Sequence, residues 1–172
     1  MKAMVLAAGF GMRLQPLTRS LPKPMFPVLG RPLLSHTFDL LQSASIDDIA
    51  VNIHHLPNSI INYFEKENPP PFNLHLSTEK KILGTAGGIK KMQGFLEEGP
   101  FITINSDIIT DLEINKVINF HKNNNSKLTL VVRQDISPEQ YDSIEICKNG
   151  RIAHFIGASS MNIPKKTTRV FS

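Results

Sequence analysis

The sequence predicts an α/β fold of three layers (αβα), in which a mostly parallel sheet lies between helices and is followed by a C-terminal β-hairpin. Short runs rich in Ile, Val, Leu and Phe alternate along the chain with longer segments whose apolar residues recur at helical spacing. After residue 134 two short runs flank Asn149-Gly150, a strong signal for a tight hairpin turn. The length of 172 residues fits one domain, so we expect a single domain over 1–172.

The expected elements follow from these patterns. β-branched and apolar runs predict strands at 2–8, 48–54, 72–77, 100–105 and 127–133. Helical spacing predicts helices at 32–45, 57–67, 85–96 and 112–123, the last beginning near Asp111, a good N-cap residue. The hairpin strands are expected at 142–147 and 151–156, and 157–172 is expected to form an irregular tail. Parallel sheets bind ligands beyond the carboxyl ends of their strands, which directs attention to 6–13 and 104–107.

The amino-acid composition indicates which kinds of molecule the chain is expected to bind. The net charge is +4, from 19 basic and 15 acidic residues, and the basic pairs at 80–81 and 90–91 lack interleaved aromatic residues. We therefore expect an anionic small molecule and no nucleic acid. No run approaches the roughly 18 apolar residues of a membrane span, so no membrane partner is expected. With one cysteine, Cys147, an intrachain disulfide is impossible, which favours the cytoplasm. The sequence is also compatible with a homo-oligomer.

The turn Gly9–Leu14 (GFGMRL) follows the first apolar run. Leu14 stands where a dinucleotide-binding fingerprint would carry a third glycine, and no Gly-Lys-Ser/Thr of a P-loop is present. The glycines still let backbone N–H groups approach an anion closely, and Arg13 adds a planar, permanent cation that suits phosphate oxygens. A tight turn explains the glycines alone equally well.

Lys23 and Asp107 strengthen the case for a phosphate site. Lys23 lies between two prolines, which restrict its backbone and present the ammonium from a rigid segment. Asp107 directly follows an expected strand, and Mg²⁺ bound together with substrate phosphates needs only one or two carboxylates. Asp111 is a second candidate ligand, but a capping role already explains it. A solvent-exposed lysine remains the plainer explanation for Lys23 by itself.

Glu79 and the segment Leu83–Gly88 (LGTAGG) also follow a strand and begin a helix. The small residues would allow a flat nucleobase to lie against backbone, and an ionised Glu79 could accept a hydrogen bond from the ring N–H of uracil or guanine. A glycine-rich loop that merely begins a helix is the alternative. His54 and His55 are adjacent, so in an extended segment they would point to opposite faces and act as ordinary polar residues.

Four motifs together resemble the sugar-1-phosphate nucleotidyltransferase family: Leu6–Thr18 (LAAGFGMRLQPLT), Pro22–Val28 (PKPMFPV), Gly84–Gly88 (GTAGG) and Asn105–Asp107 (NSD). The resemblance extends from residue 1 to about 156. Val51–Leu56 (VNIHHL) looks like the branch that contains mannose-1-phosphate guanylyltransferases and N-acetylmuramate-1-phosphate uridylyltransferases. The resemblance to the family implies the Rossmann-like sheet of the nucleotide-diphospho-sugar transferases.

The resemblance implies that a sugar 1-phosphate attacks the α-phosphorus of a nucleoside triphosphate, giving a nucleotide-sugar and pyrophosphate. The resemblance also implies that Arg13 and Lys23 are catalytic residues that bind the phosphates. It further implies that Asp107 is a catalytic residue that holds Mg²⁺. The nucleotide would lie against Leu6, Ala7, Ala8, Gly9, Gly11, Met12, Arg13, Lys23, Glu79, Gly84 and Thr85.

The chain also departs from the family pattern. The family supplies a second metal-binding aspartate from a later strand, and many relatives carry Glu-Lys-Pro after the hairpin where this chain has Gly157–Ser160 (GASS). We therefore expect a C-terminal part of the family domain to be missing. The nucleotide half of the site is predicted, and turnover by this chain alone stays in doubt.

A non-catalytic nucleotide-binding or regulatory module is one alternative function. A dinucleotide-dependent oxidoreductase is another, against which the absent third glycine and the Lys23 segment argue.

Overall fold

The computed structural model describes residues 1–132, 143–147, 149–155, 158–159 and 167–171. The chain divides into two compact units, Met1–Asn115 and Lys116–Ser172. The first unit contains a parallel sheet and the second an antiparallel one. No helix in the described part of the chain is long and apolar enough to cross a membrane.

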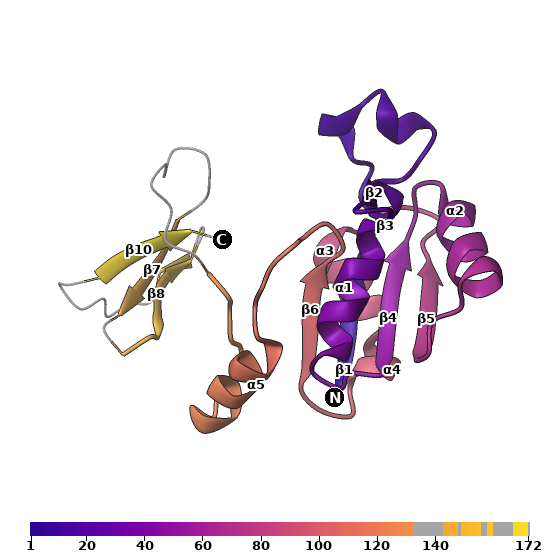
Figure 1. Ribbon diagram of the computed structural model, residues 1–172. Coiled ribbons are helices and arrows are strands. Elements are labelled where there is room, and N and C mark those ends of the chain that lie inside the picture. Colours follow the sequence, from indigo (N-terminus) through magenta and orange to yellow (C-terminus); the bar gives the residue numbers. More distant parts are fainter. Residues whose placement is uncertain (133–142, 148, 156–157, 160–166, 172) are drawn as a thin grey trace. The chain divides into compact units, whose positions relative to one another are not determined.

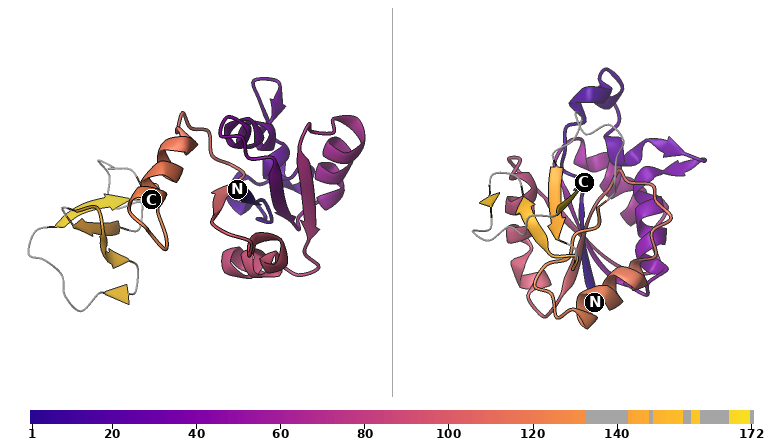
Figure 2. Two further views of the ribbon diagram at one scale, coloured as in Figure 1. Left: turned by 90° about the horizontal axis from the view of Figure 1, so that it is seen from below. Right: turned by 90° about the vertical axis from the view of Figure 1, so that its left-hand side faces the viewer.

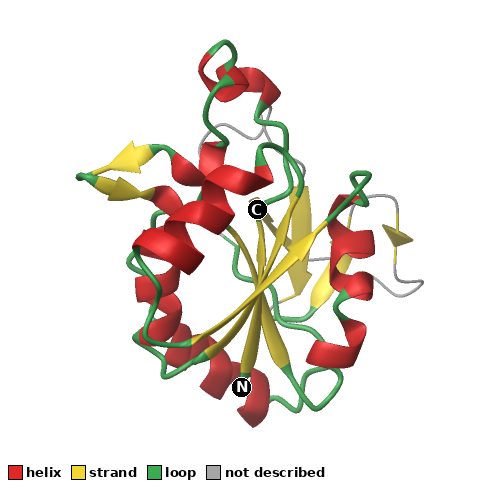
Figure 3. Cartoon of the chain, turned by 90° about the vertical axis from the view of Figure 1, so that its right-hand side faces the viewer, coloured by secondary structure: helices red, strands yellow, loops and turns green. Residues whose placement is uncertain are grey.

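The sheet of the first unit has four strands in the order β5-β4-β1-β6 (Figure 1). Their bounds are β1 Lys2–Leu6, β4 Asp48–Ile53, β5 Asn73–Thr78 and β6 Phe101–Asn105. All neighbours pair in parallel, which confirms four of the expected strands and the parallel sheet. The strands splay through the twist of the sheet, as Figure 3 shows.

Helices cover both faces of this sheet, which confirms the three-layer prediction. α1 (Leu33–Gln42) lies on one face, and α3 (Gly84–Lys91) with α4 (Gln93–Leu96) lies on the other (Figure 2). Met4 of β1 and Ala50 of β4 pack with Leu96 of α4 in one buried cluster. Because side chains alternate across a strand, their neighbours in sequence face the opposite layer.

The helix expected at 57–67 changes character along its length. It consists of α2 (Pro57–Ile61) and the π-helical η4 (Asn62–Glu67), and Phe64 of η4 packs edge-to-face on Phe38 of α1 with ring centroids 5.1 Å apart. The helix expected at 85–96 is interrupted at Met92, between α3 and α4, where the backbone leaves helical geometry at φ −94°, ψ 15°.

A small hairpin between residues 27 and 32 was not predicted. β2 (Pro27–Val28) and β3 (Arg31–Pro32) are joined by Leu29 and Gly30, both at positive φ (50° and 78°), as a type I′ turn requires. Arg31 donates two hydrogen bonds to the carboxylate of Asp39 in α1, at 2.7 and 3.1 Å. The hydrogen bond and the charge of Asp39 raise the pKa of Arg31 above its ordinary value.

The second unit contains the predicted hairpin. β7 (Ser143–Cys147) pairs antiparallel with β8 (Ile152–Phe155). At the turn, Gly150 adopts φ 79° and the Cys147 N–H donates to the Arg151 carbonyl at 2.8 Å. The expected outer ends of the two strands, 142 and 156, lie outside the described residues.

Two expectations for the C-terminal region were wrong. Residues 127–132 form no strand, and Leu128 and Val131 are exposed (69% and 53%), so the strand propensity of these residues does not decide their structure. Residue 133 lies outside the described residues. The tail expected to be irregular contains β9 (Ala158–Ser159), which pairs with β8, and β10 (Thr167–Phe171), which pairs with β7.

The helix preceding this region starts later than expected. α5 spans Ile114–Asn123 and crosses the boundary between the two units. Asp111 therefore lies three residues before the first helical residue, which is too far away for the N-cap position. Three 3₁₀ turns complete the first unit: η1 (Met12–Leu14), η2 (Leu17–Arg19) and η3 (Lys23–Met25).

Packing of α1 on the sheet predicts an unequal pair of leucine substitutions. Leu34 is fully buried in α1, whereas Leu29 is 92% exposed in the hairpin turn. We expect Leu34→Ala to lower the free energy of unfolding by about 2–5 kcal/mol and Leu29→Ala to change it by less than about 0.5 kcal/mol. Urea denaturation of both variants, followed by circular dichroism, measures the difference. Equal effects would contradict the described core.

Candidate functional site

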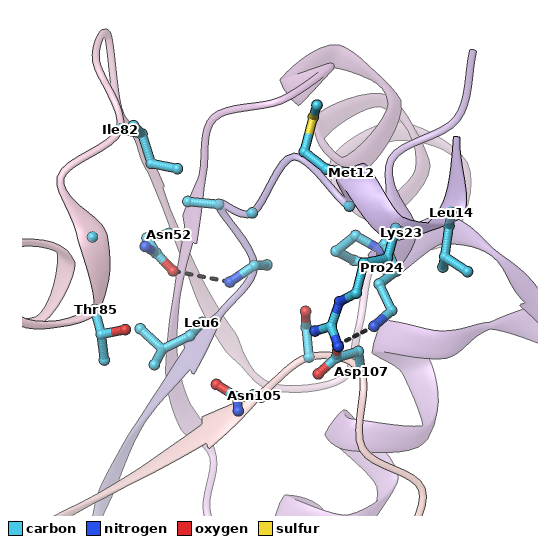
Figure 4. Close-up of a pocket in the computed structure, with 17 residues that line it drawn as sticks. Leu6, Met12, Leu14, Lys23, Pro24, Asn52, Ile82, Thr85, Asn105 and Asp107 are labelled. Atoms are coloured by element: carbon cyan, nitrogen blue, oxygen red, sulfur yellow. Dashed lines mark hydrogen bonds and ion pairs between the residues drawn. The ribbon is translucent and has the colours of Figure 1, made fainter. Parts of the chain in front are cut away.

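Three parallel strands of the first unit end side by side. In the sheet register, Leu6 of β1 pairs with Asn52 of β4 on one side and with Asn105 of β6 on the other. The segments that follow these strands therefore meet at one edge of the sheet. A cavity of about 420 Å³ lies there. The residues that line it are drawn as sticks in Figure 4: Leu6, Ala7, Ala8, Gly9, Gly11, Met12, Arg13, Leu14, Lys23, Pro24, Asn52, Ile82, Gly84, Thr85, Asn105, Ser106 and Asp107.

The turn after β1 requires glycine at position 11. Gly11 adopts the left-handed conformation (φ 63°, ψ 34°), and a Cβ there would lie 2.7 Å from Cγ2 of Thr18. Thr18 is 1% exposed, and its hydroxyl donates to the Gly11 carbonyl at 3.2 Å. The contact with Thr18 therefore stabilises this conformation of the turn.

The two adjacent histidines support this turn. Nε2 of His55 lies 2.6 Å from the Thr18 carbonyl, and Nδ1 of His54 lies 2.8 Å from the Glu79 carbonyl. Both rings contact Phe10, with centroids 5.8 and 5.2 Å from the Phe10 ring. They do not point to opposite faces as expected, because β4 ends at Ile53 and the backbone leaves the extended conformation.

Two cations and one carboxylate reach the cavity. Arg13 lies in η1 and is exposed. Lys23 begins η3, directly after the extended Pro22, and the segment is anchored by the buried Pro24. The Lys23 ammonium forms an ion pair with Asp107, as the dashed line in Figure 4 marks. Each side chain of the pair is about one-third exposed (32% and 33%), so incoming solute can reach both.

A buried polar pair consists of Asn52, which lines the cavity, and Glu79, which does not. Asn52 is 3% exposed; its Oδ1 accepts a hydrogen bond from the Ala7 N–H at 3.0 Å, and its Nδ2 donates to Oε1 of Glu79 at 2.8 Å. Oε2 of Glu79 accepts from the Leu83 N–H at 2.8 Å. Glu79 is itself 3% exposed. Both of its oxygens are thus engaged by protein donors.

The structure brings together nearly all residues that the sequence singled out. Every predicted nucleotide-binding residue except Glu79 lines the cavity, and so does Asp107. Glu79 has a different environment from the one expected, because its carboxylate is buried and holds Asn52 and Leu83 instead of facing the cavity. Six lining residues had no predicted site role. Ile82 lies outside the sequence motifs, whereas the other five lie within them: Leu14, Pro24, Asn52, Asn105 and Ser106. For Asn52, a polar residue inside the apolar run 49–53 was a usable signal.

A metal at this site would have few protein ligands. The described residues contain no group of three or more His, Cys, Asp or Glu side chains able to hold an ion by themselves. Among the described residues that line the cavity, Asp107 is the one carboxylate. This donor set fits a hard cation that completes its coordination with phosphate oxygens and water.

Comparison with protein families identifies the chain. The model of the family described as nucleotidyl transferase matches residues 2–157. The chain belongs to the nucleotidyl transferase family. Mannose-1-phosphate guanyltransferase of Yarrowia lipolytica is 33% identical over 165 residues, which cover 94% of this chain and 43% of that protein. The chain spans 40–47% of the length of the curated relatives it matches.

Two solved structures share the fold of this chain. HddC from Yersinia pseudotuberculosis, crystallised in complex with GMP-PN, matches with a TM-score of 0.78 and 25% identity over 99% of this chain and 72% of that one. A putative glucose-1-phosphate thymidylyltransferase from Bacillus anthracis matches with a TM-score of 0.81 at 20% identity, over 100% of this chain and 69% of that one. These matches confirm the fold class predicted from the sequence.

The strand-end turn predicts a matched pair of glycine substitutions. An alanine at position 11 would take a left-handed backbone and contact Thr18, whereas a Cβ at Gly9 would meet no atom within 4 Å. We expect Gly11→Ala to lower the free energy of unfolding by about 1–3 kcal/mol and Gly9→Ala to change it by less than about 1 kcal/mol. Chemical denaturation checks this, and equal stability of the two variants would contradict the described turn.

Proposed function

We propose that this chain carries the nucleotide half of a site that transfers a nucleoside monophosphate from a nucleoside triphosphate to a sugar 1-phosphate. One observation carries the proposal: the cavity at the strand ends brings Arg13, Lys23 and Asp107 together around a glycine turn. A triphosphate needs such an arrangement of fixed cations and backbone N–H groups. Membership of the nucleotidyl transferase family supports the reaction class.

The chemistry of the reaction suits these residues. A sugar 1-phosphate is already an anion, so its attack on the α-phosphorus requires no general base. The main obstacle is the repulsion between two anions, which makes positioning and charge neutralisation the expected sources of rate. Arg13 would hold the triphosphate and stabilise the departing pyrophosphate. Lys23 would bind the phosphates at the reacting centre, and the backbone from Ala7 to Gly11 would surround the triphosphate.

We propose Mg²⁺ as the cofactor and Asp107 as its protein ligand. Nucleotidyltransferases of this family generally use a divalent metal. When bound, the ion would neutralise charge on the phosphates. The ion pair with Lys23 gives Asp107 a partner in the free site. If Asp107 held a metal, the Lys23 ammonium would be available to meet phosphate oxygens.

The base side of the site would be formed by Gly84 and Thr85, with Glu79 supporting them from behind through the Leu83 N–H. Relatives named mannose-1-phosphate guanyltransferases make GTP and mannose 1-phosphate the first pair to test. We place the protein in the cytoplasm, a location that its single cysteine supports.

The proposal predicts that Arg13 and Arg19 differ in importance. Both arginines are exposed in short 3₁₀ turns, but Arg13 lines the cavity and Arg19 does not. We expect Arg13→Ala to weaken triphosphate binding about 10- to 100-fold, as loss of a charge-assisted hydrogen bond does. Arg19→Ala should change the affinity less than about twofold. Isothermal titration calorimetry with GTP, UTP, dTTP and CTP in Mg²⁺ measures both; equal effects would contradict the site.

Turnover is tested separately by pyrophosphate release. The wild-type chain, Arg13→Ala and Asp107→Ala are each supplied with Mg²⁺, a triphosphate and a panel of sugar 1-phosphates. Release by the wild type that falls about 10²–10³-fold in both variants supports the roles above. Release that survives both substitutions would overturn them. Triphosphate binding without release in the wild type would favour a non-catalytic nucleotide-binding module.

A further inference from the structure

Asn52 connects two walls of the cavity. It lies opposite Leu6 in the sheet register, next to the end of β4, and is 3% exposed. Its Oδ1 accepts from the Ala7 N–H at 3.0 Å, on the wall formed by the turn after β1. A dashed line from Asn52 marks this hydrogen bond in Figure 4. The amide oxygen of Asn52 therefore faces the wall formed by the turn after β1, which we call the triphosphate wall.

The other end of the amide reaches the opposite wall through Glu79. Nδ2 of Asn52 donates to Oε1 of Glu79 at 2.8 Å, and Oε2 of the same carboxylate accepts from the Leu83 N–H at 2.8 Å. Leu83 directly precedes Gly84, the first residue of α3 and part of the cavity wall. A continuous chain of three hydrogen bonds therefore runs from Ala7 to the segment that would face the base.

Because Gly88 has no side chain, the Asn52–Glu79 pair fits against its backbone. A Cβ at Gly88 would lie 2.6 Å from Nδ2 of Asn52 and 3.1 Å from Oε1 of Glu79. The first distance is shorter than real Cβ contacts, so any larger residue would displace the pair. Gly88 lies inside α3, where glycine is less favourable than alanine, and its close approach to Asn52 gives a packing reason for it.

We propose that Asn52 is a positioning residue for nucleotide selectivity: it fixes the base wall at Gly84 and Thr85 relative to the triphosphate wall. This rests on the function proposed above. The triphosphate wall loses one hydrogen bond without Asn52, that of the Ala7 N–H, but it keeps its other supports, because Leu6 is paired on both sides and Arg13 and Lys23 lie on separate turns. The segment before α3, in contrast, is tied to the sheet edge through the Asn52–Glu79 pair. Loss of the pair should therefore relax discrimination among bases more than it weakens binding of phosphates.

Two variants that break the pair from opposite sides test the inference. Asn52→Ala removes the amide, and Gly88→Ala inserts a methyl group against it. Gly94→Ala is the matched control, because Gly94 is also helical but a Cβ there would meet no atom within 4 Å. Calorimetry in Mg²⁺ gives dissociation constants for GTP, UTP, dTTP, CTP and inorganic tripolyphosphate, and circular dichroism gives the melting temperature of each variant.

We expect the wild type and Gly94→Ala to prefer one triphosphate by about tenfold or more. Asn52→Ala and Gly88→Ala should reduce that preference to about threefold or less, while tripolyphosphate affinity stays within about threefold of the wild type. A preference that both variants retain would overturn the inference and leave the proposed function standing. A parallel loss of tripolyphosphate affinity, or equal wild-type affinity for all four triphosphates, would overturn it as well. Absence of any triphosphate binding by the wild type would overturn the proposed function itself.

Discussion

The register of the parallel sheet is the constraint on which the site depends. Leu6 pairs with Asn52 and with Asn105, so β1, β4 and β6 end at the same level. Each strand then delivers a different group: backbone after β1, a buried amide at the end of β4 and a carboxylate after β6. A shift of one residue in either pairing would turn Asn52 or Asn105 to the other face, because side chains alternate along a strand. The cavity exists because three separate stretches of sequence finish together.

Charge and geometry are supplied by different parts of the site. The charged groups, Lys23 and Asp107, are one-third exposed, and such accessible ion pairs contribute on the order of 0–1 kcal/mol. The proposed triphosphate, with several negative charges, could therefore compete for Lys23 at little energetic cost. The buried pair of Asn52 and Glu79 is different, since unsatisfied polar groups in such a place cost about 1–3 kcal/mol each. The cations can exchange partners while the buried pair holds its geometry.

The sequence predicted those features that depend on local pattern. Four strands, the αβα layers and the turn at Asn149-Gly150 follow from periodicity and turn chemistry. The glycine turn with Arg13 and the carboxylate of Asp107 follow from position at strand ends, and Lys23 follows from its two flanking prolines. Features that depend on partners distant in sequence were not predicted. Burial of Glu79 depends on Asn52, 27 residues earlier. The apolar run at 127–132 forms no strand although its residues favour one, because strand propensity cannot show whether another strand pairs with the run.

Gly87 and Gly88 lower the helix propensity of α3 but allow the close packing that the site requires. Gly87 and Gly88 each cost an exposed helix about 1 kcal/mol relative to alanine, which is severe for a helix of only eight residues. Yet a Cβ at Gly87 would lie 2.8 Å from Cβ of Leu83, and one at Gly88 would displace Asn52. The helix therefore persists through packing, not through its own propensity, and its glycines are needed for close approach. The same small residues that weaken α3 as a helix bring its N-terminus near the strand ends, where the base would lie.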